Sequence, residues 1–428
     1  MAKDDRKTLL VLSQTFVPDP ASVGQHMADV AFEMGRRGHR VVVYTSRHGY
    51  ENPDVEYPKR ESRDGVEIRR LGMSSFGKKN LLIRALGTLT FSLQCFVLAL
   101  FTPRLEGIFF STSPPLIGAF AAVVAMLRRV PVAYWAMDLN PDQLIAMGKI
   151  GPRSFTARVL ERVNRFILKR SALVVALDRF MADRLRARGV RDAKMLIMPP
   201  WPHEDCMDAA PRDQNPFRVA HGLVGKTVIM YSGNHSPANP LRTLLDAAVR
   251  FKADDSIRFL FVGGGLGKKE VEATIRDNAL ANVVSLPYQP LESLGNSLGA
   301  ADVHVVSLGE NMIGIIHPCK IYGAMAVGRP VLFLGPRPSH VSDLLDQHEI
   351  GWHVAHGDVE GMVRAIERIR QTPAETMARM GQTARRVLQA DMGQAILCGR
   401  FCDHLERVFH PREAPVAPAD ERNVPCAR

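Results

Sequence analysis

The amino-acid sequence predicts two α/β domains, each built on a doubly wound parallel sheet with helices on both faces. Two observations lead to this prediction. Short apolar runs alternate with helical segments along most of the chain, and a Pro-rich polar stretch interrupts the alternation near residue 200. Alternation of this kind is typical of parallel sheets covered by helices. A chain of 428 residues also suits two domains of about 200 residues better than a single core.

The first half opens with a continuous apolar run over residues 9–13, as expected for a strand that is buried on both faces. A loop containing Gly24 leads into a helix over 26–37, and Gly38 ends this helix from a C-cap position. Further strands are expected at 40–45, 66–71, 107–111, 130–137, 173–177 and 194–198. The helices expected among them cover 81–101, 115–129, 155–170 and 180–189.

The second half restarts the pattern after a predicted linker over 199–216. Strands are expected at 227–232, 257–262, 283–286, 303–307, 331–335 and 352–354. Helices are expected at 240–251, 269–278, 291–300, 320–328, 340–346 and 359–371, followed by a long helical region over 373–405.

These patterns predict four parts of the chain. A first Rossmann-like domain covers 1–205, and a second Rossmann-like domain covers 206–375. A helical region over 376–410 is expected to pack back toward the N-terminal domain, and the polar tail 411–428 is expected to be disordered. Ligands of open α/β sheets bind at the carboxyl ends of the strands, so we expect the site in a deep cleft between two facing domains.

The formal net charge of +11 predicts a surface that attracts anions such as acidic lipid headgroups or phosphorylated substrates. The alternative is a basic but otherwise ordinary protein. No zinc-finger spacing, RNA-binding strand motif or basic region followed by heptads is present, so nucleic acid is not an expected partner. The six cysteines show no metal-binding spacing, and nothing indicates a signal peptide or an oxidising compartment. We therefore expect a cytoplasmic protein.

The apolar segment 81–101 is nearly long enough to span a bilayer. Arg84, Gln94 and several hydroxyl groups within it argue against a span. The interpretation favoured is a buried or partly exposed helix; an interfacial membrane contact and a spanning helix are the alternatives.

Two common nucleotide-binding motifs are absent. Gly24 stands alone after the first strand, so the dinucleotide fingerprint is missing. The glycine-rich run 262–269 has too short a spacing for a P-loop, and no Ser or Thr follows its lysine. A dehydrogenase or a P-loop enzyme is therefore not expected.

Four stretches carry a resemblance to a known family: 9–46, 130–142 (VPVAYWAMDLNPD), 228–248 (VIMYSGNHSPANPLRTLLDAA) and 315–335 (IIHPCKIYGAMAVGRPVLFLG). By their order and spacing the chain resembles the family 4 retaining glycosyltransferases of the GT-B fold, and most closely their bacterial surface-polysaccharide members, over residues 8–408. The resemblance implies retaining transfer of a sugar from a nucleoside-diphosphate sugar. It also implies that the domain over 1–205 binds the acceptor and that the domain over 206–375 binds the nucleotide-sugar donor. No DxD motif is evident, so no metal is expected.

The resemblance assigns two parts of the first half to the site. Gly24 and Gln25 lie in the opening loop, which faces the donor diphosphate and the acceptor in the family; a helix start favours an anion there. The alternative is a plain turn from strand to helix. Asp138 follows a buried strand and is the candidate to orient an acceptor hydroxyl or to take its proton. Its alternative role is to cap the turn before Pro141, and the histidine that many members carry nearby is missing.

On the donor side the resemblance points to Gly233, Asn234 and His235, and to the glycine turn at Gly263 and Gly264. Many members carry an Arg and a Lys that bind the donor phosphates where this chain has Asn234 and Asn239. For both glycine-containing turns a purely structural role is the alternative.

The last predicted donor contacts are Pro318, Lys320, Ile321 and Tyr322. Backbone amides at the start of helix 320–328, together with Lys320, would neutralise the diphosphate leaving group. The alternative for Lys320 is a solvated surface lysine. Members often carry two glutamates at the positions that Ile315 and Gly323 occupy here, so both carboxylates are missing.

These observations together predict an EC 2.4 glycosyltransferase of hexosyl or N-acetylhexosaminyl type. Its donor would be a UDP- or GDP-sugar, with no separate cofactor, and its acceptor a lipid-linked (polyprenyl diphosphate) saccharide. We expect a peripheral enzyme at the cytoplasmic face of the inner membrane. A nucleotide-sugar 2-epimerase on the same fold and a catalytically degenerate sugar-nucleotide-binding protein are the alternatives.

Overall fold

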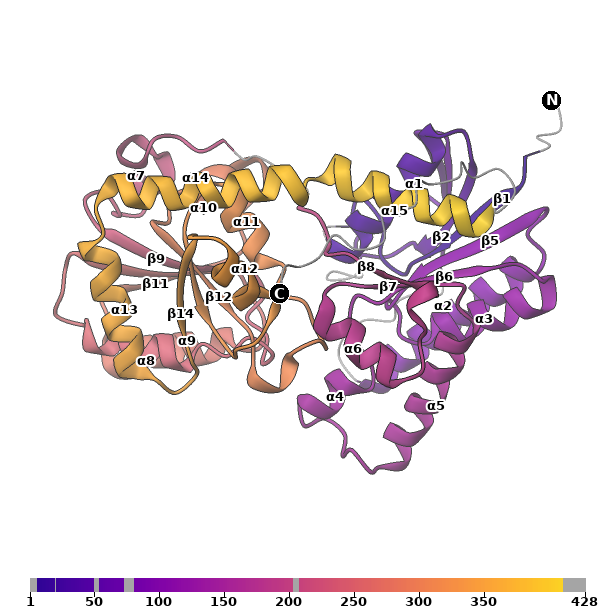
Figure 1. The fold of residues 1–428 in the computed structure, drawn as a ribbon, viewed down its shortest axis with the longest axis horizontal. Helices are drawn as coiled ribbons and strands as arrows, with labels where there is room; N and C mark the ends of the chain where they lie inside the picture. The colour runs from indigo at the N-terminus through magenta and orange to yellow at the C-terminus, as the bar shows by residue number, and fades with distance from the viewer. Residues whose placement is uncertain (1–5, 20, 50–53, 73–80, 203–207, 411–428) are drawn as a thin grey trace. The chain divides into compact units, whose positions relative to one another are not determined.

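The computed structural model describes residues 6–19, 21–49, 54–72, 81–202 and 208–410, and these residues form two sheets (Figure 1). The first sheet has the strand order β3-β4-β2-β1-β5-β6-β7-β8, and the second has the order β11-β10-β9-β12-β13-β14. The predicted pair of α/β sheets is therefore confirmed.

The strands of the first sheet are β1 (Thr8–Leu12), β2 (Arg40–Ser46), β3 (Arg60–Arg63), β4 (Val66–Leu71), β5 (Leu105–Ser111), β6 (Val132–Trp135), β7 (Leu173–Ala176) and β8 (Met195–Ile197). Those of the second are β9 (Thr227–Ser232), β10 (Ile257–Val262), β11 (Val283–Leu286), β12 (Val303–Ser307), β13 (Val331–Leu334) and β14 (Gly351–Val354).

The helices up to residue 200 are α1 (Ser22–Arg36), α2 (Leu81–Leu100), α3 (Ile117–Arg128), α4 (Asp142–Ala146), α5 (Phe155–Arg170) and α6 (Arg179–Ala187). Those after it are α7 (Pro216–Ala220), α8 (Arg242–Arg250), α9 (Lys268–Asn278), α10 (Leu294–Gly299), α11 (Lys320–Ala326), α12 (His340–Gln347), α13 (Val359–Gln371), α14 (Ala374–Asp391) and α15 (Gln394–Phe409).

Strand pairing follows from the apolar character of the strands. All five residues of β1 are buried, and the strand pairs in parallel with β2 on one side and β5 on the other. The antiparallel edge strand β3 was not predicted, because its sequence RESR is polar and largely exposed. A polar edge of this kind protects a sheet from pairing with other chains.

Alternation along the strands creates two apolar layers around the second sheet. On β9, Val228 and Met230 belong to one buried cluster, whereas Ile229 and Tyr231 belong to the other. Because successive side chains point to opposite faces of a sheet, each cluster lies on its own face. Residues of α10 and α11 cover the first face, and residues of α8 and α13 cover the second (Figure 1).

Contacts divide the chain into two compact units. One contains residues up to 135, residues 167–174 and the chain from 398; the other contains residues 136–166 and 175–397. The predicted boundary between 205 and 206 and the predicted disordered tail 411–428 lie outside the described residues, and the four predicted parts stay a prediction.

From Cys398 onward, α15 is part of the first unit and lies beside α1 (Figure 1). The ring of Phe401 lies 4.5 Å from that of Trp135 and 5.4 Å from that of Phe109, measured between centroids. Arg37, at the end of α1, donates to Asp403 Oδ1 at 2.6 Å and to Glu406 Oε2 at 3.1 Å. An aromatic contact and an ion-pair cluster therefore fix this helix.

The helix α2 has two different apolar faces. Phe91, Cys95 and Ala99 are fully buried on one face, while Leu89 and Leu93 are about half exposed on the other. Among the described residues, no helix combines the length and the apolar character that crossing a bilayer requires. The segment therefore has one face packed in the core and one face that carries exposed apolar side chains.

Replacing Phe401 by Ala should lower the free energy of unfolding of the first unit by about 3–5 kcal/mol, because it leaves a cavity between two aromatic rings. Urea unfolding followed by tryptophan fluorescence measures this. The variant F155A is the control, since Phe155 is 74% exposed. Equal effects of the two substitutions would contradict the packing described.

Candidate functional site

The turns after β9 and β10 meet because the two strands are paired in register. Ser232 pairs with Val262, so Gly233 and Gly263 follow side by side. Both have positive φ, 126° and 125°, and a Cβ atom on Gly263 would clash with the carbonyl oxygen of Gly233. Side chains are excluded at both positions, which leaves exposed backbone at this edge of the sheet.

The glycine-rich turn after β10 also forms hydrogen bonds with the backbone of His235. The His235 amide donates to Gly264 O at 2.7 Å, and the Gly267 amide donates to His235 O at 2.8 Å. The His235 ring is buried, its Nδ1 lies 3.3 Å from Gly264 O, and its buried Nε2 has no hydrogen-bond partner among the described residues. Burial lowers the pKa of His235, so the ring is neutral at pH 7.

Lys320 brings an ammonium group to these turns. A Cβ atom on Gly233 would lie 2.8 Å from Lys320 Cε, and Nζ lies 5.4 Å from the centroid of the Tyr231 ring. The side chain is partly buried rather than solvated, and burial lowers its pKa. In the part of the chain that the structure describes, no carboxylate pairs with this ammonium. A partly buried cation without a counter-ion is a candidate anion-binding group.

Asn239 holds Lys320 in place. Its Nδ2 donates to Ser307 O at 2.7 Å, which fixes the carboxamide so that Oδ1 accepts from Lys320 Nζ at 3.3 Å. The family often has a lysine at the position of Asn239. In this chain Asn239 is instead a buried hydrogen-bond acceptor that positions Lys320.

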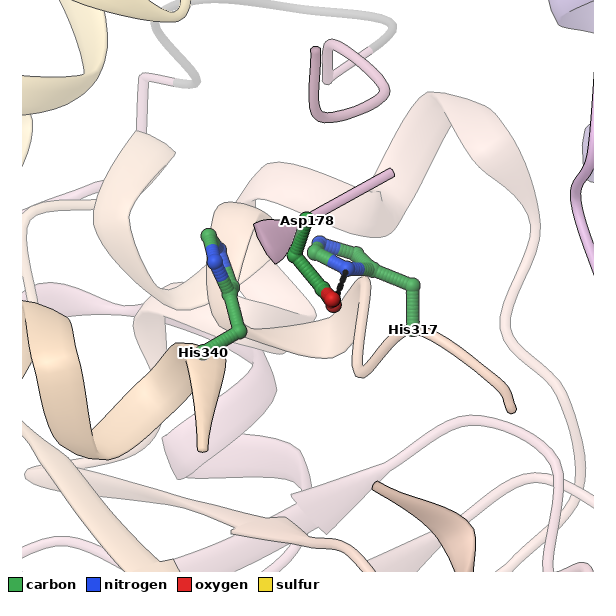
Figure 2. A group of neighbouring side chains, drawn as sticks. All are labelled: Asp178, His317 and His340. Atoms are coloured by element: carbon green, nitrogen blue, oxygen red, sulfur yellow. Dashed lines mark hydrogen bonds and ion pairs between the residues drawn. The ribbon is translucent and has the colours of Figure 1, made fainter. Parts of the chain in front are cut away.

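His317, one residue before Pro318, is the centre of a buried hydrogen-bond network (Figure 2). His317 Nδ1 lies 2.9 Å from Asp178 Oδ2, and Nε2 lies 2.7 Å from the Tyr322 hydroxyl. That hydroxyl lies 3.1 Å from His340 Nε2. Buried polar contacts therefore fix the end of the loop that precedes Lys320 and join it to the first turn of α11.

Burial and pairing set the charges of this network. Burial would raise the pKa of Asp178, but the hydrogen bond from His317 and the charge of that histidine outweigh this effect and lower it. Asp178 also accepts from the Met181 amide at 2.8 Å as the N-cap of α6. Burial lowers the pKa of His340 to about 3, so its ring is neutral.

Asp178, His317 and His340 are also a possible metal-binding group, with ligand atoms within 4.8 Å of one another. Both ring nitrogens of His317 already have hydrogen-bond partners, however. This arrangement fits a hydrogen-bond network that supports the loop better than it fits a metal site. Transfer without a metal stays a prediction.

Asp138 follows β6, in a segment tied to the chain before His317. The Leu139 amide donates to Ile315 O at 2.9 Å, which places Asp138 beside the position of a missing family glutamate. Among the described residues its carboxylate has no hydrogen-bond partner, and burial raises its pKa to about 6. It caps no helix, since α4 begins after Pro141 without a side-chain cap.

The remaining predicted residues differ in their surroundings. Gly24 and Gln25 were predicted in a loop before a helix over 26–37, but α1 already begins at Ser22, so both lie in its first turn, in the first unit. A Cβ atom on Gly24 would approach Phe16 N to 2.9 Å. Packing alone therefore requires this glycine. Ile321 belongs to the core of the second sheet, and the Tyr322 hydroxyl is engaged in the network. Direct contacts of these residues with a donor stay predictions.

The structure thus brings Gly233, Asn234, His235, Gly263, Gly264 and Lys320 together around one sheet edge. Sequence reasoning missed Asp178, His317 and His340. The one available signal was that Asp178 follows a buried strand and that His317 precedes the Pro318 motif.

Two family matches cover most of the chain. Residues 22–201 match the glycosyl transferase 4-like domain, and residues 226–372 match the glycosyl transferases group 1. The probable glycosyltransferase WbjE of Pseudomonas aeruginosa is 26% identical over 62% of this chain and 65% of its own length. The putative colanic acid biosynthesis glycosyl transferase WcaI of Escherichia coli K12 is 24% identical over 75% of this chain and 81% of its own length.

Solved structures with the same fold cover nearly the whole chain. Sucrose-phosphate synthase of Thermosynechococcus elongatus has a TM-score of 0.73 at 16% identity, covering 94% of this chain and 99% of its own. The Anabaena protein HepE, in complex with UDP and glucose, has a TM-score of 0.69 at 15% identity, covering 94% and 100%. The predicted GT-B fold is confirmed. With a glycosyl transferase 4-like first half and a group 1 second half, the chain belongs to the family 4 glycosyltransferases of the GT-B fold.

Proposed function

We propose that the chain transfers a sugar from a nucleoside-diphosphate sugar to a lipid-linked saccharide in the synthesis of a cell-surface polysaccharide, with retention and without a metal ion. The observation that carries the proposal is the ammonium of Lys320, which lies beside the glycine turns and is paired with no carboxylate of the described residues. The relatives WbjE and WcaI are named as glycosyltransferases, and WcaI is assigned to colanic acid synthesis. UDP is the first nucleotide to test, because HepE was solved with UDP.

In this proposal Lys320 and the backbone at Gly233 and Gly263 receive the diphosphate. The leaving diphosphate gains negative charge as the glycosidic bond opens, so a fixed cation lowers the barrier to its departure. Asn239 keeps the ammonium in place, so that less side-chain entropy is lost when the diphosphate binds than with a freely rotating lysine. Neutral His235 completes the turn without adding charge.

Asp138 has the properties of an acceptor-side group. A carboxylate with a pKa of about 6 is ionised at pH 7 and still basic enough to accept a proton from a hydroxyl. Because the Leu139 amide donates a hydrogen bond to Ile315 O, the backbone of Asp138 lies next to the position where the family glutamate is missing. We infer that it orients the acceptor hydroxyl.

A membrane surface fits the exposed face of α2. Leu86, Leu89, Leu93 and Val97 are exposed at helical spacing, and α2 packs on α3, which adds exposed Leu127. Together these residues form an apolar strip that a soluble surface rarely tolerates. A bilayer interface would cover it, and the net charge of +11 favours an anionic leaflet.

Replacing Lys320 by Ala should weaken UDP binding about tenfold to a hundredfold, because a charge-assisted hydrogen bond to the diphosphate is lost. Isothermal titration calorimetry measures this, and K320R should retain part of the affinity. Exposed Lys269 supplies the control K269A. If K320A bound UDP as tightly as the unaltered chain, the proposed donor site would be wrong.

The pH dependence of transfer should follow Asp138. Its raised pKa means that the carboxylate is protonated below about pH 6 and charged above it, so kcat/KM should fall as the pH drops through about 6. D138N should reduce kcat about 10²- to 10⁴-fold with little change in UDP affinity. The exposed Asp183 gives the control D183N. An unchanged pH profile in D138N, or turnover of the donor without any acceptor, would contradict this role.

Membrane binding should depend on the apolar strip of α2. L89Q/L93Q should bind vesicles of mixed phosphatidylglycerol and phosphatidylcholine about tenfold more weakly, because the variant loses the free energy of moving two leucine side chains from water into the bilayer interface. V219Q/V224Q changes two exposed valines of the second unit and is the matched control. Equal sedimentation of both variants with vesicles would argue against a membrane contact at α2.

A further inference from the structure

A basic hollow of about 480 Å³ lies among α4, α5 and the end of α6, within the second unit. Its charged lining consists of Arg158, Arg162, Arg165, Arg188, Asp142 and Glu161. Four guanidinium groups face two carboxylates, so the lining has a net charge of 4 − 2 = +2.

Both carboxylates of the hollow are engaged by other arginines. Glu161 accepts from Arg165 at 2.8 Å and from Arg188 at 3.4 Å. Asp142 accepts from Arg188 at 2.5 Å. Its other oxygen lies 3.5 Å from Arg184. The two acidic side chains are thus paired with Arg165, Arg184 and Arg188, and neither is paired with Arg158 or Arg162.

Arg158 and Arg162 are the remaining charges. Both are exposed, and within the described ranges neither forms an ion pair or a side-chain hydrogen bond. Their spacing of four residues places them on one face of α5, where like charges repel. Two guanidinium groups at this spacing are suited to a shared anion, because each can present two parallel N–H donors to a phosphate.

Apolar groups accompany the two arginines. Phe155 is 74% exposed and precedes Arg158 by three residues, so both lie on the same face of α5. Ile145 and Pro152 line the hollow itself. A phosphate attached to an apolar molecule can use both the cations and this surface, whereas a free phosphate ion uses only the cations.

We propose that this hollow binds a phosphate group, with Arg158 and Arg162 as its ligands and with a lipid as the molecule that carries it. The site takes no part in the transfer step proposed above, and it is independent of Lys320. It would hold the protein on a phosphate-bearing surface through specific contacts in addition to bulk charge.

The test compares R158Q/R162Q with K252Q/R386Q. Lys252 and Arg386 are exposed cations of the same unit that make no ion pair among the described residues, so both double variants lose the same charge. Sedimentation with phosphatidylglycerol-containing vesicles should fall about tenfold for R158Q/R162Q and less than about twofold for the control. R158K/R162K keeps the charge but loses the paired donors, and should lie between them.

Inorganic phosphate, titrated by calorimetry in the presence of saturating UDP, separates the two sources of the anion. Loss of vesicle binding with weak binding of inorganic phosphate supports a lipid phosphate. Tight phosphate binding that R158Q/R162Q abolishes supports the same site with a soluble ligand. Equal losses in both double variants, or none in either, would overturn the proposal. UDP binding of all variants reports separately on the donor site and on correct folding.

Discussion

The structure of the candidate site depends on the close approach of two glycine turns at the ends of β9 and β10. Because Gly263 carries no Cβ atom, its backbone can lie against the carbonyl group of Gly233. Because Gly233 carries none, the side chain of Lys320 can lie directly against the backbone of the first turn. That contact keeps an ammonium group partly buried, with an amide oxygen and an aromatic ring as its neighbours. These two neighbours offset only part of the energetic cost of burying the cation, and no carboxylate among the described residues neutralises it. An uncompensated charge of this kind suits the diphosphate that we propose as its ligand.

Buried polar contacts around His317 support the part of the chain in which family members often carry two glutamates that are missing here. Gly323 and Ile315 stand at those positions, and the loop between them is held by His317, which lies between Asp178 and Tyr322. The backbone of Ile315 in turn holds the segment of Asp138. In the function that we propose, one carboxylate from a different strand end thus serves the acceptor side, while hydrogen-bonded histidines keep the donor loop rigid.

The fold was predictable because its strands are short apolar runs, and β1 and β9 are buried as their sequences indicate. The polar edge strand β3 and the short helix α7 carry no such pattern and were missed. For the site, family resemblance identified Lys320 and the glycines that meet it. It could not identify the network, because Asp178, His317 and His340 come from distant segments. The strand end before Asp178 and the Pro318 motif after His317 do not show that these side chains meet. The basic hollow could not be predicted from the sequence for the same reason. Helical spacing shows that Arg158 and Arg162 share a face of α5, but it does not show that α4 and α6 lie beside that face.

The most direct test of the account is a crystal structure of the chain with UDP. An oxygen of the diphosphate should lie within about 3 Å of Lys320 Nζ and beside the backbone of Gly233 and Gly263. Asn239 should still contact the lysine, and the loop containing His317 should keep its hydrogen bonds. A diphosphate bound elsewhere in the chain, with Lys320 paired only to Asn239 as in the free protein, would contradict the central claim.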